Sequence, residues 1–421
     1  MPEFVLLLAL MCFIVLAWLR FSVALGVFAF VLPAYQIRFQ FFGVPTTLVE
    51  ILLAILFVVW LVRTHPTLSL VRKTPFLLPA MLLLLAAAVG VMISPDRHAG
   101  LGAFKAYFLE PILFYIVLWR ELRFKQAIQW VLIGLGCAAM VTGLIAMFQY
   151  LQIFPSPAPW DMESPRRVVG VFAYPNAVGL FVSPIAALFF AVVLFRGFSS
   201  RFRYFAGTVL VACVLGIMFS VSRGAALAVF ASFLMLALFH HARRWFVLGL
   251  FALILLALIV PTTRAVILAV ATGRDVSTDV RTVVWQGTVR LLKDRPIQGA
   301  GLGGFPIVYN EYRLAKHTEL LLYPHNILLN FWVELGFAGV IVMAWLFCSA
   351  IAQAVRAAQS LREPLSRTVT LGALAALIGM AAYGLVDVPY LKNDLALLFW
   401  FCLAMIAAAS FPIPANSGQN T

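Results

Sequence analysis

Long, uninterrupted runs of apolar residues are the feature that most limits what this chain can fold into. A helix that crosses a membrane needs about 20 predominantly apolar residues. Candidate runs lie near residues 3–19, 21–35, 46–62, 76–93, 104–119, 127–150, 171–195, 204–221, 224–239, 245–261, 325–355, 368–386 and 395–412. They do not alternate apolar and polar residues, which excludes a membrane β-barrel. The pattern predicts an all-α fold, a polytopic transmembrane helical bundle of 12–13 spans.

The composition also excludes a soluble protein. Hydrophobic residues make up 64% of the chain and charged residues 11%, against about half and about a quarter in soluble domains. The spans use most of the apolar residues, so we expect one membrane domain over residues 1–421. The five cysteines lie inside apolar runs without metal-ligand spacing, which predicts small buried side chains. We interpret the N-terminal run as a retained span and not as a removed signal peptide.

The placement of the basic residues predicts the orientation. One set of alternate loops carries 15 of the 30 Lys and Arg residues but only two of the 16 acidic residues, Glu121 and Glu363. The basic residues are Arg20, Arg63, Arg72, Lys73, Arg120, Arg123, Lys125, Arg196, Arg201, Arg203, Arg243, Arg244, Arg356, Arg362 and Arg367. Short loops rich in Lys and Arg face the cytoplasm, so we predict that this set of loops is cytoplasmic. With its basic residues placed in this way, the net charge of +14 predicts contact with membrane lipids and no nucleic-acid partner. Thirteen spans place the N-terminus outside, and twelve place it inside.

The segment 262–323 falls on the outer side and is too long for a structureless loop. Its sequence predicts a helix over 280–293, ended by Arg295-Pro296, then a glycine-rich turn at 299–304 and a short helix at 306–317. Helical periodicity places Arg281 in the middle of an apolar face. That face contains Val284, Trp285, Val289, Leu291 and Leu292. A guanidinium aimed inward needs an anionic ligand or a counter-charge such as an internal Glu.

Several motifs in this half of the chain carry a family resemblance. They are Arg167–Asn176 (RVVGVFAYPN), Ser222–Gly224 (SRG), Arg281–Trp285 (RTVVW), Asp294–Phe305 (DRPIQGAGLGGF), Pro324–Asn330 (PHNILLN) and Glu334–Gly339 (ELGFAG). Together they resemble the signature of the O-antigen ligase and O-antigen polymerase superfamily. The resemblance covers about residues 160–395, whereas the first 150 residues are similar only in hydropathy.

The resemblance implies a glycosyltransferase of the bacterial inner membrane with a periplasmic active site. Members move a glycan from an undecaprenyl-diphosphate carrier to an acceptor, which in ligases is the lipid A–core of lipopolysaccharide. It further implies an inverting, metal-independent reaction in which His325 is catalytic and Arg223 and Arg281 are the partners of the diphosphate. No D-x-D motif or metal-ligand spacing occurs in the sequence, so we expect no cofactor and a diphosphate clamp of basic side chains.

The chemistry of the individual residues is compatible with these roles. His325 follows Pro324 at the predicted start of a helix, where the positive helix end favours the neutral imidazole that a general base needs. Arg223 lies in the shortest outer turn, where it either meets a diphosphate or extends to lipid headgroups. Arg167, Asn326, Asp387 and Arg290 complete the predicted substrate-binding set. Asp387 either orients His325 or pairs with an arginine.

The sequence leaves open the role of the glycine cluster and the choice between three functions. The glycine cluster at 299–304 is either a plain turn or a phosphate cradle, and Glu50 and Glu110 are expected to pair with outer arginines. An O-antigen polymerase is the alternative within the same class, because it uses a second carrier-linked glycan as acceptor. An ion or inorganic carbon transporter is the alternative from another class, although its site belongs near the midplane between inverted repeats.

Overall fold

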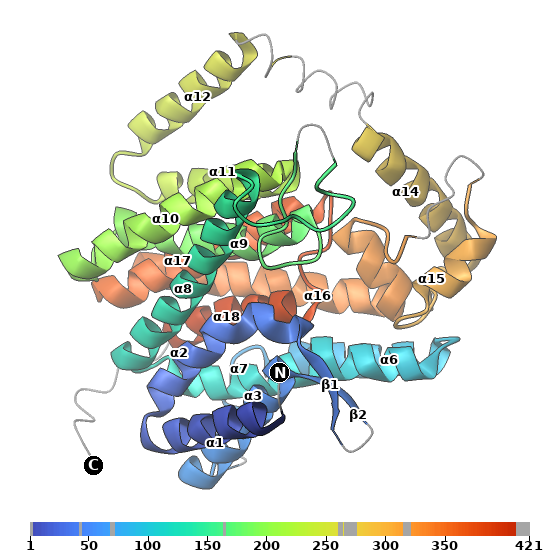
Figure 1. The fold of residues 1–421 in the computed structure, drawn as a ribbon, viewed down its shortest axis with the longest axis horizontal. Coiled ribbons are helices and arrows are strands. Elements are labelled where there is room, and N and C mark those ends of the chain that lie inside the picture. The colour runs from blue at the N-terminus through green and yellow to red at the C-terminus, as the bar shows by residue number, and fades with distance from the viewer. Residues whose placement is uncertain are drawn as a thin grey trace.

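The computed structural model describes residues 3–41, 44–67, 72–162, 166–259, 264, 276–314 and 321–409. It is 77% helical, and its helices form one bundle with a two-stranded hairpin at one end (Figure 1). The bundle helices are α1 (Glu3–Leu19), α2 (Phe21–Val31), α3 (Leu48–Thr64), α5 (Leu77–Ile93), α6 (Arg97–Phe104), α7 (Glu110–Glu121), α8 (Lys125–Tyr150), α9 (Pro175–Leu194), α10 (Ser200–Ser220), α11 (Arg223–Leu238), α16 (Ile327–Ser360), α17 (Pro364–Gly384) and α18 (Asn393–Ala409). Helix α12 (Arg243–Ile259) contacts α11 and otherwise stands apart from the bundle in Figure 1. The predicted all-α fold is confirmed.

Membrane-compatible helices dominate the described part of the chain. Six helices there are long and apolar enough to cross a membrane, and five further apolar helices are 10–17 residues long. Large apolar side chains are exposed on the outer helices, including Phe4 (74%) on α1 and Leu78 (60%) on α5. Such surfaces are stable only against lipid or another apolar partner. The chain is therefore a multi-pass membrane protein.

Three helices form the centre of the bundle. Residues of α9, α17 and α18 are buried over almost their whole length, and α9 packs against α8, α10, α11 and α17. Their sequences are apolar on every side, which is the pattern of a fully buried helix. This centre fixes the relative positions of the loops at the two ends of the bundle.

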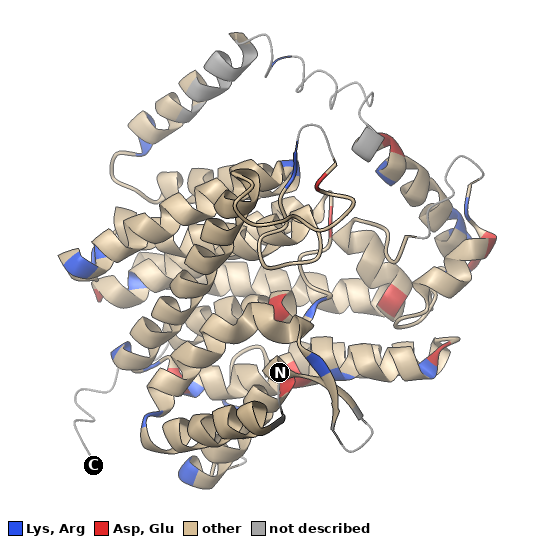
Figure 2. Cartoon of the chain, viewed as in Figure 1, with Lys and Arg blue, Asp and Glu red and all other residues tan. Residues whose placement is uncertain are grey.

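Charged residues divide between those two ends. Figure 2 shows Lys and Arg with few acidic residues around the start of α10, whereas acidic and basic residues mix around α14 and α6. The first end carries the loops after α9, α11 and α16, and the second carries the hairpin of β1 (Arg38–Phe41) and β2 (Val44–Thr47) and the start of α9. We call them the basic end and the mixed end.

The segment before α16 packs at the mixed end. α14 (Val276–Asp294) contains the predicted helix, but the second helix is shorter than expected: α15 covers Phe305–Val308, followed by one 3-10 turn at Tyr309–Glu311. Phe305, Val308 and Tyr309 are buried at helical spacing in a small cluster with α14, so one turn already buries the apolar face. The part of the predicted helix over 315–317 lies outside the described residues.

The glycine-rich turn is a packing element. Gly299, Gly301 and Gly303 have positive φ, a conformation open to residues without Cβ. The backbone N–H groups of Ala300 and Gly301 both donate to Val333 O in α16, and that of Gly303 donates to the carboxylate of Glu334. These N–H groups donate to acceptors inside the protein. This favours the interpretation of the segment as a plain turn and not as a phosphate cradle.

Candidate active site

His325 stands just outside the helix that it was expected to begin. The Oδ1 of Asn326 accepts hydrogen bonds from two backbone N–H groups in the first turn of α16, at 3.0 and 3.1 Å. This cap places the start of the helix at Ile327, two residues later than predicted. His325 has a left-handed backbone conformation, with φ 51°, which costs a non-glycine residue about 1–3 kcal/mol. The strained loop holds the imidazole over the helix end.

A buried carboxylate faces this imidazole. Nδ1 of His325 lies 3.4 Å from Oδ1 of Asp387, whose side chain is 0% exposed while that of His325 is 20% exposed. Burial alone would raise the pKa of Asp387, but the hydrogen bond from His325, the charge that His325 carries when protonated, the Val388 N–H and the charge of Arg281 outweigh it and lower the pKa. Asp387 is therefore ionised, and a carboxylate opposite Nδ1 favours the tautomer with the proton on Nδ1.

Asn176 connects Asp387 to Arg167. Its Nδ2 donates to Oδ2 of Asp387 at 3.2 Å, and its Oδ1 accepts from Nη2 of Arg167 at 2.9 Å. The Nε of Arg167 donates to Ser220 O at 3.1 Å, and its guanidinium lies 5.8 Å from the centre of the Trp160 ring. Asn176 thus has a polar partner on each side, which gives it a definite orientation.

The Ser222-Arg223-Gly224 turn contacts the same network through Tyr383. The Ser222 and Tyr383 hydroxyls are 2.6 Å apart, and the Tyr383 hydroxyl donates to Asn176 O at 3.2 Å. A Cβ on Gly224 would clash with the Tyr383 ring. Ser222 and Gly224 therefore position Tyr383, while Arg223 is exposed at the first residue of α11. We call Arg167, Asn176, Tyr383, Asp387 and His325 the His325 network.

Arg281 reaches this network from α14. It is half-buried and continues the buried stripe of Val284, Thr288 and Leu291, and its positive charge acts on both Asp387 and Tyr383. The predicted inward-facing stripe is present, except that Val289 is 42% exposed. The Trp285 indole N–H donates to Pro324 O at 2.8 Å, so α14 also supports the loop that carries His325.

The roles of several aromatic residues in and beside the motifs were not predicted from the sequence. The Tyr323 ring centre lies 4.3 Å from that of His325, and burial, followed by the charge of Asp387, raises the Tyr323 pKa well above its usual range. The rings of Tyr35, Phe172 and Tyr174 surround the ammonium of Lys392 at 5.0–5.3 Å. The position of Tyr323 directly before Pro324-His325 was the one available sequence signal.

Other predicted residues lie elsewhere or do structural work. Arg290 is on the exposed face of α14, and the structure does not bring it into the His325 network. Asn326 caps α16 and donates from Nδ2 to Leu385 O at 3.1 Å, so both ends of its amide are engaged. Glu50 pairs with Lys105 at 2.8 Å, where an arginine was expected, and accepts from Asn393 at 3.0 Å.

Over the described part of the chain, no group of three or more His, Cys, Asp or Glu side chains is placed to hold a metal ion. Three guanidiniums lie at or near the His325 network, those of Arg167, Arg223 and Arg281. Guanidinium is the side-chain group best shaped for bidentate phosphate binding.

Comparison with known families gives one match. Residues 207–344 match the family described as O-Antigen ligase, which confirms the predicted resemblance to the O-antigen ligase and polymerase superfamily. The matched segment contains Arg223, Arg281 and His325, whereas Arg167, Asn176 and Asp387 lie outside it. No curated protein matches the chain.

Proposed function

We propose that this membrane enzyme, which carries an O-antigen ligase domain at residues 207–344, transfers a glycan from undecaprenyl diphosphate to lipid A–core at the periplasmic face of the bacterial inner membrane. One observation carries the proposal. His325, which lies in the matched domain, has its Nδ1 opposite the buried carboxylate of Asp387, with the charge of Arg281 close by. When a hydroxyl displaces a diphosphate, the reaction needs a base for the hydroxyl proton and a cation for the diphosphate. An imidazole oriented by a carboxylate and a nearby guanidinium supply these two groups.

The orientation of His325 defines its role. When Nδ1–H donates to Asp387, Nε2 carries a lone pair and accepts the proton of the acceptor hydroxyl. That hydroxyl oxygen forms a bond to the anomeric carbon of the donor sugar from the face opposite the diphosphate. The bond between the anomeric carbon and the diphosphate oxygen breaks with its electrons on that oxygen, so the configuration inverts.

The arginines stabilise the leaving group. Arg281 and Arg223 come from α14 and α11, and we assign them to the diphosphate oxygens, on which negative charge grows as the bond breaks. Arg167 is anchored through Nε and Nη2, so we assign it to positioning Asn176 and to the glycan side. Because guanidiniums neutralise the diphosphate, we expect transfer to survive exhaustive chelation of divalent ions, and a strict requirement for Mg²⁺ or Mn²⁺ would contradict this clamp.

Two features support a periplasmic site. The basic end carries the loops with 15 Lys and Arg residues and two acidic residues, which the positive-inside rule assigns to the cytoplasm. His325 and its partners lie at the mixed end. Arg223 is the first residue of α11. At this end of the helix a cation can meet a phosphate whose lipid tail remains in the bilayer.

The test is transfer by the purified full-length protein in lipid nanodiscs, with carrier-linked glycan as donor and lipid A–core as acceptor. We expect a lipid A–core product from the wild type and a rate lower by about 10²–10⁴-fold in His325→Ala, the range for loss of a general base. His98→Ala is the matched control, because His98 is exposed on α6.

Three other outcomes of this experiment would each contradict one part of the proposal. Extension of carrier-linked glycan without lipid A–core would identify a polymerase and overturn the acceptor assignment. A His325→Ala variant as active as His98→Ala would overturn the base. Ion uptake without any glycan product would overturn the enzyme assignment.

A further inference from the structure

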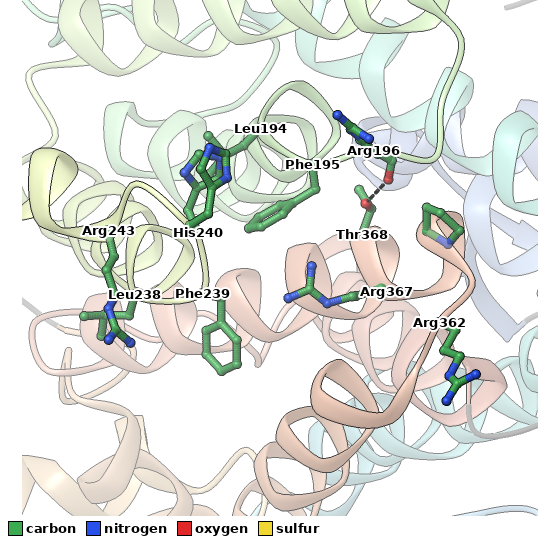
Figure 3. Close-up of a pocket in the computed structure, with 12 residues that line it drawn as sticks. Leu194, Phe195, Arg196, Leu238, Phe239, His240, Arg243, Arg362, Arg367 and Thr368 are labelled. Carbon is green, nitrogen blue, oxygen red and sulfur yellow. Dashed lines mark hydrogen bonds between the residues drawn. The ribbon is translucent and has the colours of Figure 1, made fainter.

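Three loops at the basic end border an open pocket of about 640 Å³. They follow α9, α11 and α16, and Figure 3 shows Phe195 and Arg367 toward the middle of the lining residues, with Arg196, Arg243 and Arg362 at the margins. The lining residues are Leu194, Phe195, Arg196, Leu238, Phe239, His240, His241, Arg243, Arg362, Pro364, Arg367 and Thr368. Helices α9 and α11 end at this pocket and α17 begins there. The opposite ends of these three helices carry Asn176, Ser222 and Tyr383, so this pocket is separate from the proposed active site.

Positive charge dominates the lining. It contains four arginines and two histidines, and no Asp or Glu is among the residues that line it. The neighbouring acid, Glu363, is engaged elsewhere: its carboxylate accepts from the backbone N–H groups of Leu365, at 3.1 Å, and Ser366, and caps α17. Like charges around one space repel each other, so an anion in that space is favourable.

The pocket is built by the fold and not by loose side chains. The Nε of Arg367 donates to Ala358 O at 3.0 Å, and its guanidinium lies 5.7 Å from the centre of the Phe195 ring. The Thr368 hydroxyl donates to Arg196 O, which joins the loop after α9 to α17. Anchoring through Nε fixes the plane of the guanidinium and presents the Nη edge for paired hydrogen bonds to an anion.

The lining is also amphipathic, which indicates the class of ligand. Leu194, Phe195, Leu238 and Phe239 provide apolar surface beside the arginines, at helix ends where lipid headgroups meet acyl chains. Basic pockets between transmembrane helices on the cytoplasmic side bind phosphate-bearing lipid headgroups. We propose that this pocket binds the phosphate headgroup of an anionic phospholipid, with Arg362 and Arg367 as the main ligands.

The test is lipid binding by the full-length protein, and it does not depend on glycan transfer. The protein is prepared in nanodiscs of phosphatidylcholine containing a minor fraction of phosphatidylglycerol, and retained lipid is counted by native mass spectrometry. We expect selective retention of phosphatidylglycerol and about tenfold weaker retention in the Arg362→Gln/Arg367→Gln variant, since one charge-assisted hydrogen bond accounts for about a factor of ten. The Arg201→Gln/Arg244→Gln variant is the matched control, because it removes the same charge at the same end but outside the pocket.

The outcomes separate the possible sources of phosphate and the role of folding. Equal loss in both double variants would show diffuse surface charge and overturn the pocket. Displacement of the lipid by millimolar inorganic phosphate would identify a free-anion site and overturn the lipid assignment. Arg362→Gln alone removes an exposed side chain, so weaker retention with an unchanged melting temperature in phosphatidylcholine supports the proposal, and unchanged retention overturns the role of Arg362.

Discussion

Helices α9, α11 and α17 carry a cluster of cationic side chains at each end, and the two clusters differ in what surrounds the arginines. At the mixed end, Arg167 is hydrogen-bonded to Asn176, and Asn176 to the buried Asp387. At the basic end, four arginines and two histidines line the pocket, and no Asp or Glu is among the lining residues. The first cluster is ordered by specific partners, and the second by its loops.

The difference teaches how the same residue type is used for two tasks. A reaction needs a base in one tautomer and guanidiniums at defined points, so the His325 network contains the carboxylate and amide groups that impose direction. Binding of a headgroup needs mainly uncompensated positive charge, so the pocket contains none of these groups. Changes of geometry should therefore matter at the mixed end, and changes of charge at the basic end.

Among the variants that test this comparison, the largest effect is expected for Asp387→Asn. An amide opposite His325 still forms a hydrogen bond but no longer favours Nδ1–H, so we expect glycan transfer to fall about 10²–10³-fold, within the range of general-base catalysis. Single-turnover assays measure this, with the melting temperature as the control for folding. Transfer unchanged within about threefold would show that Asp387 does not orient His325.

The pH dependence follows from the same carboxylate. Because the Asp387 pKa is lowered in the folded protein, its ionised form stabilises the fold above the unfolded pKa of about 3.9. That stabilisation is lost as the pH falls through the lower folded pKa. We therefore expect wild-type thermal stability to decline more steeply than that of Asp387→Asn below about pH 4, as measured by fluorescence melting in nanodiscs. Parallel decline in the two proteins would contradict the direction of the shift.

The next effect tests whether Arg281 acts through geometry. Arg281→Lys keeps the charge but loses the planar pair of donors, and we expect transfer to drop about tenfold, the equivalent of one charge-assisted hydrogen bond. Arg290→Lys, on the exposed face of α14, is the matched control. Full activity in Arg281→Lys would show that Arg281 acts through its charge alone, and the mixed end would then not differ from the pocket in this respect.

The sequence anticipated the helices well because apolar run length is set by the bilayer. The runs predicted at 76–93 and 127–150 became α5 and α8 with shifts of one or two residues. Ends set by side chains were less predictable: Asn326 moved the start of α16. The β1–β2 hairpin was not predicted, because each of its strands has only four residues. Local chemistry decides such ends, and apolar content does not report it.

The partners within the site were mostly beyond sequence reasoning. Arg223, Arg281 and His325 came from motif resemblance, and helical periodicity alone pointed Arg281 inward. The contact between Asn176 and Asp387 joins residues 211 positions apart, and that between Ser222 and Tyr383 joins residues 161 apart. No periodic pattern in one chain encodes such pairs, because they depend on how α9, α11 and α17 pack.

A smaller effect concerns the packing that positions Tyr383. Gly224→Ala would place a methyl group against the Tyr383 ring, and such overpacking costs about 1–3 kcal/mol. We expect a lower melting temperature together with slower transfer, because Tyr383 also holds Asn176. Gly207→Ala in α10 is the matched control, since its Cβ would meet no atom within 4 Å. Equal behaviour of both variants would show that the network tolerates displacement of Tyr383.

The smallest effect is expected at the basic end, from Arg362→Lys. If the pocket responds to charge, a lysine at this exposed position retains the headgroup, and phosphatidylglycerol retention changes by no more than about twofold, in line with the modest energies of exposed ion pairs. Native mass spectrometry of Arg362→Lys beside Arg362→Gln measures this directly. A loss in Arg362→Lys as large as in Arg362→Gln would show that the pocket requires the guanidinium fork, and the two ends would then follow one rule of recognition instead of two.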